Sequence, residues 1–106
     1  MLDTTTLTAA VDRFADRLRA APQSRLQRGA AAEALALARE LSVRAQRLDD
    51  PGEEPRIMPD SGVFVVADQL TVAAGDLAEA LRTAPSVAEL DEAVRSVERA
   101  AVRAGL

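Results

Sequence analysis

The fold of this chain follows from Asp49-Asp50-Pro51-Gly52-Glu53-Glu54-Pro55-Arg56-Ile57-Met58-Pro59-Asp60, a stretch at the middle of its 106 residues. Its three prolines lack a backbone N–H group and prevent a continuous helix. Five acidic residues against one Arg also make it the most negative part of the sequence. We therefore predict a long acidic loop over residues 49–61 that divides the chain into two halves. Loops of this length are unusual in small bundles and are often functional or disordered.

The N-terminal half has apolar residues that recur with the helical period, which predicts helices over residues 6–21 and 24–48. Pro22 separates them. Ser24 and Gln27 have the spacing of a capping box, in which two side chains satisfy free backbone N–H groups at a helix start. The main apolar stripes are Leu7, Val11, Phe14 and Leu18 in the first helix, and Leu26, Ala30, Ala34, Leu37, Leu41, Ala45 and Leu48 in the second.

The C-terminal half predicts helices over residues 62–83 and 87–104. Ser86 and Glu89 form a second capping box directly after Pro85, and Gly105 stands at the expected C-cap. The start of the earlier helix is ambiguous, because the β-branched and aromatic residues of segment 63–66 favour a strand. The helical period runs on through this segment, so we predict a helix there, capped by Asp60 or Ser61.

The two halves together predict an all-α fold, an antiparallel four-helix bundle in one domain over residues 1–106. The short links around residues 21–23 and 84–85 make the helices that they join antiparallel neighbours. The acidic loop then joins two helical hairpins. An alternative is a pair of hairpins that assemble only as a dimer.

The composition excludes much chemistry. The chain has no Cys, His or Lys, and all 13 basic residues are Arg. Zinc fingers, Ser-His-Asp triads, Cys nucleophiles and Schiff bases are therefore excluded. Glu33 and Glu40 lie at the edge of an apolar stripe, and we expect them to form a salt-bridge row with Arg44 and Arg47. We predict no catalytic residue, no cofactor and no metal.

The charge argues against a nucleic-acid or membrane-surface role, because the net charge is -4 and such roles normally need a basic face. The start of the sequence lacks the pattern of a signal peptide, and no apolar run approaches a membrane span, so we expect a cytoplasmic protein. Residues 23–48 are locally basic, with Arg25, Arg28 and Arg39 on one polar side. A weak DNA-associated regulator therefore stays as an alternative.

The strongest positive signal concerns association. Several apolar residues fall off the main stripes of the helices predicted over 24–48 and 62–83, and a helix that is apolar on more than one side is generally buried on more than one side. Nearly half of the hydrophobic residues are Ala, which buries little area, and thin cores often gain stability by oligomerising. We therefore predict a homodimer or a partner helix at a candidate interface of Leu35, Val43, Phe64, Val65 and Val72.

The acidic loop also carries a candidate docking segment, Arg56, Ile57 and Met58, which places two large apolar residues between prolines. The alternative is that Ile57 and Met58 anchor the loop onto the bundle and cover the second apolar face themselves. The sequence thus predicts a non-enzymatic interaction or regulatory module that self-associates. The rival interpretation is a small helical enzyme or ligand-binding bundle that uses Arg and carboxylate electrostatics; no small-molecule ligand is inferred.

Overall fold

The computed structural model describes residues 2–106. Their elements are α1 (Thr5–Ala20), α2 (Gln23–Arg25), the π-helical segment η1 (Leu26–Ala30), α3 (Ala31–Asp49), α4 (Val66–Thr83) and α5 (Val87–Ala104). These residues contain no strand, so the all-α prediction is confirmed. Residues 63–65 form a turn, and the strand alternative at this point is wrong.

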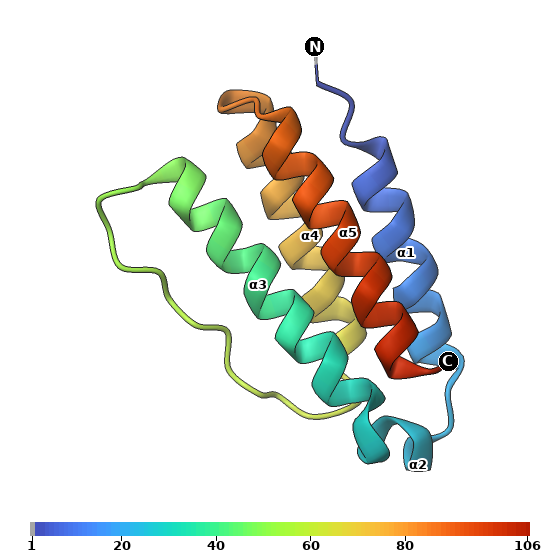
Figure 1. The fold of residues 1–106 in the computed structure, drawn as a ribbon. Coiled ribbons are helices and arrows are strands. Elements are labelled where there is room, and N and C mark those ends of the chain that lie inside the picture. Colours follow the sequence, from blue (N-terminus) through green and yellow to red (C-terminus); the bar gives the residue numbers. More distant parts are fainter. Residues whose placement is uncertain (1) are drawn as a thin grey trace.

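The four long helices form a bundle around one core (Figure 1). α1 runs antiparallel to α4, since Arg19 near the end of α1 pairs with Asp68 near the start of α4 at 2.9 Å. α3 runs antiparallel to α5, since Arg44 late in α3 pairs with Glu89 early in α5 at 2.6 Å. The four-helix bundle is therefore the fold of this chain.

The long loop changes the arrangement within the bundle. α3 and α4 run in the same direction: the starts of both helices meet at Ala31 and Val66, and later positions meet at Gln46 and Asp76 (Figure 1). The loop therefore returns along the length of α3, about 28 Å at 1.5 Å per residue. The helices joined by short links, α1 with α3 and α4 with α5, are antiparallel as predicted but lie diagonally and not as direct neighbours.

Local chemistry sets the helix ends, and the structure corrects the predicted helices at three points. Ser86 accepts a hydrogen bond from the backbone N–H of Glu89 at 3.1 Å, which confirms this cap of α5, and Gly105 ends α5 in the left-handed conformation. Ser24 is not a cap, because the extended Pro22 precedes α2 and its carbonyl accepts the N–H groups of residues 25 and 26. The predicted capping box at Ser24 and Gln27 is therefore wrong.

The helix predicted over residues 24–48 is also interrupted. Gly29 has a φ of 155°, which produces a kink inside η1. Glycine accepts this backbone conformation because it has no Cβ. The helix predicted from residue 62 begins only at Val66. The side chain of Asp60 accepts a hydrogen bond from the N–H of Gly62 within the loop, so it does not cap α4.

Alanine shapes the core. Of the 28 buried apolar residues in the described part of the chain, 14 are Ala. Small side chains let helix axes approach closely. α3 packs most extensively against α4, and the two helices bury Ala34, Ala38, Ala73 and Ala74. Large fully buried side chains are correspondingly few, with Phe14 as the only aromatic residue among them.

Candidate functional site

Three of the predicted interface residues are exposed on α4 and in the turn before it. Phe64 is 76% exposed, Val72 is 60% exposed and Val65 is 41% exposed. Val65 and Val72 are seven residues apart and therefore lie on one side of the helix. We call this surface, Phe64, Val65 and Val72, the α4 face.

The other two predicted interface residues lie elsewhere. Leu35 is buried in the core of the chain. It lies near Val63 and Val66, where the loop ends and α4 begins. Its side chain therefore offers little surface to a partner. Val43 is half-buried and lines a groove on the outer side of α3. Helices α3 and α4 thus do not present one continuous apolar surface.

A strap, residues 55–60, explains this separation. Gln46 of α3 accepts a hydrogen bond from the backbone N–H of Arg56 and donates one to its carbonyl, both at 2.8 Å. Arg39 donates to the carbonyl of Met58 at 2.7 Å, and Gln69 of α4 donates to the carbonyl of residue 59 at 2.9 Å. The strap is therefore fastened to both helices along their common side.

The candidate docking residues divide between two roles. Met58 is partly buried and packs against the core, which places it as an anchor of the strap. Ile57 is 62% exposed and lines the groove on α3. Arg56 is exposed, and its backbone is the part that Gln46 holds.

The Gln46→Ala variant tests how the strap is held. We expect the backbone N–H of Arg56 to exchange with solvent about fivefold faster, because its acceptor is lost and an intramolecular hydrogen bond contributes roughly 1 kcal/mol. Hydrogen exchange followed by NMR measures this. The control is Gln27→Ala, an exposed glutamine in η1. Unchanged exchange in the Gln46 variant would show that the strap is held by its other contacts.

The groove on α3 is lined by residues from three segments and has a volume of about 590 Å³. We call it the α3 groove. Its apolar residues are Ala36, Val43, Leu48 and Ile57, and its charged residues are Arg39, Glu40, Arg44, Arg47 and Glu89. The helical period did not predict this groove, although Arg39 and Arg47 flank Ala36 and Val43 along the outward side of α3.

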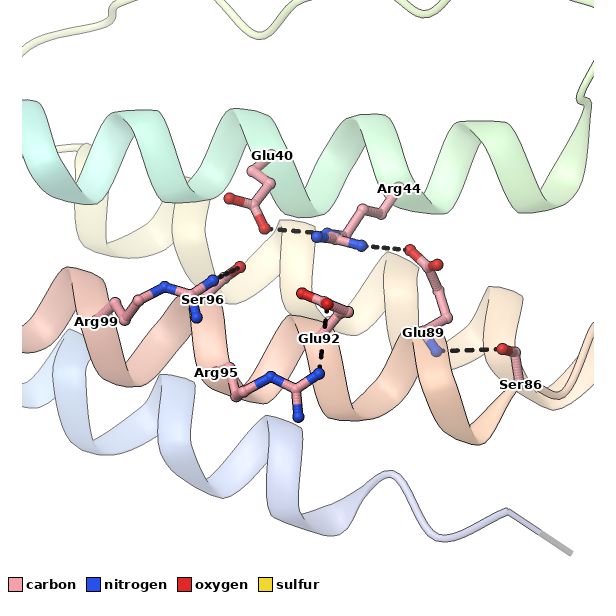
Figure 2. Close-up of polar contacts among 8 residues, drawn as sticks. All are labelled: Glu40, Arg44, Ser86, Glu89, Glu92, Arg95, Ser96 and Arg99. Atoms are coloured by element: carbon pink, nitrogen blue, oxygen red, sulfur yellow. Dashed lines mark hydrogen bonds and ion pairs between the residues drawn. The ribbon is translucent and has the colours of Figure 1, made fainter.

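Arg44 is the hub of the polar contacts at this groove. Figure 2 shows its guanidinium between Glu40 of the same helix, at 3.0 Å, and Glu89 of α5, at 2.6 Å. Burial lowers the pKa of Arg44, but the hydrogen bonds and the attraction of Glu89 and Glu40 outweigh it and raise the pKa above its ordinary value. Arg44 therefore stays a cation. The three side chains form an ion-paired link between α3 and α5.

The capping box predicted at Ser86 and Glu89 is therefore only half formed. The backbone N–H of Glu89 bonds Ser86, while its carboxylate turns to Arg44 (Figure 2). The predicted salt-bridge row is correct for Glu40 with Arg44. Glu33 instead pairs with Arg103 of α5 at 2.8 Å, a partner that only the fold brings near.

The three arginines on which the DNA-associated alternative depends each donate a hydrogen bond to a backbone carbonyl. Arg25 donates to Gly105, Arg28 to Ser24 and Arg39 to Met58. Among residues 2–106, no group of three or more potential acidic or sulfur and nitrogen ligands is placed to hold a metal ion. In the same part of the chain, no helix is long and apolar enough to cross a bilayer.

No family model, curated protein or solved structure is significantly similar to this chain.

Proposed function

We propose that this protein is a non-enzymatic interaction module that self-associates through the α4 face. The observation that supports the proposal is the exposure of Phe64, Val65 and Val72 on α4 and in the turn before it. Apolar residues that gather on a surface are typical of interaction sites, whereas single ones are ordinary. Phe64 is the more telling of the three, because it is one of only two aromatic residues in the chain.

The spacing of the two valines suits a two-fold axis. If two copies of α4 pack antiparallel about a point between Asp68 and Gln69, Val65 of one copy meets Val72 of the other, and the reverse. Such reciprocal pairing is what a two-fold interface requires. The seven-residue spacing places both valines on one side of the helix, so that both can take part in this pairing.

Charge does not oppose this geometry at its centre. Asp68 would approach its own copy across the axis, and two like charges there would repel. Arg19 of the same chain pairs with Asp68 at 2.9 Å, and hydrogen bonding to Asp68 is the main cause that raises the pKa of Arg19. The carboxylate thus already has a cationic partner before the copies meet.

The expected affinity is modest. Each apolar side chain that becomes fully buried contributes about 1.5–3 kcal/mol, and association also costs translational and side-chain freedom. Three side chains per copy then correspond to a dissociation constant on the order of 10–100 μM.

Sedimentation equilibrium tests the proposal at protein concentrations from a few micromolar to about 1 mM. We expect the wild type to shift from monomer toward dimer over this range. The Val65→Asp, Val72→Asp double variant should stay monomeric, because association would bury two additional charges per copy.

The matched control is the Val87→Asp, Val102→Asp double variant. These valines are also exposed but lie at the two ends of α5, and the charge change is the same. The control should dimerise like the wild type. A wild type that is monomeric throughout, or a control that loses dimerisation as fully as the α4 variant, would contradict the proposal.

A further inference from the structure

We infer that the α3 groove is a docking site for an acidic amphipathic helix of another protein. This goes beyond the proposed self-association, because it uses a different surface: the groove is lined by residues of α3, the strap and α5, and by none of the α4 face. Three features of the groove support the inference, namely its apolar floor, its free cationic groups and its length.

The floor of the groove is apolar and shallow. Ala36 and Val43 are seven residues apart on the outward side of α3, and Ile57 of the strap lines the same groove. A side chain as small as Ala leaves room for another helix to approach. Ile57 is 62% exposed, so a docked apolar residue would shield it from water. Helices that bind in grooves commonly use an apolar face in this way.

The cations of the groove favour an acidic partner. Arg47 is exposed, and it makes no ion pair within residues 2–106. Arg39 uses its Nε atom on the strap, which leaves its terminal N–H groups for a carboxylate. Arg44 is already satisfied by two carboxylates. The groove thus offers two guanidinium groups in a chain whose net charge is -4.

The same features select a protein helix over nucleic acid. Single-stranded nucleic acids bind through aromatic side chains on which the bases stack, and the groove contains none.

The dimensions set the pattern of the expected partner. From Ala36 to Leu48 the groove follows α3 for about 18 Å, or roughly three helical turns. Arg39 and Arg47 are separated by about 12 Å along the axis. The partner helix should therefore carry apolar residues at helical spacing, with carboxylates about two turns apart beside them.

The test uses a fluorescein-labelled synthetic helix of about 18 residues, with a Leu ridge flanked by Glu, and fluorescence anisotropy with the full chain. We expect saturable binding that weakens as salt is added. The Arg47→Glu variant should bind about tenfold more weakly. The matched control is Arg17→Glu, an exposed arginine of α1 with the same change of charge, and its affinity should stay within about twofold of the wild type.

A second pair of variants tests the apolar part. Ile57→Ser should weaken binding about fivefold, whereas Val102→Ser, at an exposed position on α5, should leave it unchanged. Circular dichroism confirms that each variant is folded. The same peptide with Lys in place of Glu should not bind.

Four results would overturn the inference. The first is no saturable binding of the Glu peptide below about 1 mM, and the second is equal binding of the Lys peptide. The third is an equal loss of affinity in the Arg47 and Arg17 variants. The fourth is tighter binding of a short DNA duplex than of the peptide, if Arg47→Glu abolishes it, because the groove would then be a nucleic-acid site.

Discussion

The Phe14→Ala variant is expected to lose about 3–5 kcal/mol of unfolding free energy, the cost typical of emptying a buried aromatic site. Phe14 is 2% exposed and is the largest side chain of a core in which half of the buried apolar residues are Ala. Small neighbours cannot extend to fill the space, so the cavity remains. Domains of this size have unfolding free energies of about 5–15 kcal/mol, and the variant should therefore be close to unfolding. Urea denaturation followed by circular dichroism measures the loss.

Phe64→Ala is the matched control, because it makes the same substitution at the only other Phe. Phe64 is largely exposed, and its removal should change the unfolding free energy by less than about 0.5 kcal/mol at concentrations where the protein is monomeric. Equal destabilisation by the two variants would show that Phe64 packs into the fold, which would remove it from the α4 face.

Ala38→Leu is expected to destabilise the fold by about 1–3 kcal/mol, the cost of forcing extra methyl groups into a packed interior. Ala38 is fully buried in α3, the helix that packs most extensively against α4. A larger side chain pushes these helices apart, because no empty space receives it. The loss is measured by the same urea denaturation.

The control for this variant is Ala36→Leu, two residues away on the same helix but exposed. Both substitutions have nearly the same helix propensity, so the difference between them reports packing alone. Ala36→Leu should stay within about 0.5 kcal/mol of the wild type. If Ala38→Leu is as stable as the wild type, the interface of α3 with α4 is more loosely packed than its buried alanines indicate.

The sequence predicted a feature correctly where that feature depends on neighbours in the chain. The apolar period located all four long helices, and Ser86 and Gly105 marked the ends of α5, because a cap involves only residues a few positions apart. The prediction was wrong at Ser24, since Pro22 supplied an earlier start, and at Gly29, whose unusual φ has no signature beyond the presence of a glycine.

The candidate surfaces also depend on residues that are far apart in the chain, which the helical period cannot reveal. Leu35 and Val65 both fall off the main stripes of their helices, so the period alone could not distinguish them. The structure buries Leu35 beneath the region where the loop reaches α4 and leaves Val65 at the surface. Only the α3 side of the α3 groove could be predicted, because Ile57 and Glu89 reach it from two other segments.

The sequence by itself therefore determined that the chain is helical, where its helices lie, and that its middle forms a loop because its prolines prevent a continuous helix. These properties arise from period, caps and prolines, which act within a few residues. The tertiary structure decided that α3 and α4 run in the same direction, that the loop returns along α3 as a strap, and that the α4 face stays exposed. The physical reason is that a 16-residue connection between α3 and α4 is long enough to end at either end of α3. Only the packing of the alanine-rich helices and the hydrogen bonds of Gln46, Arg39 and Gln69 select one course for it.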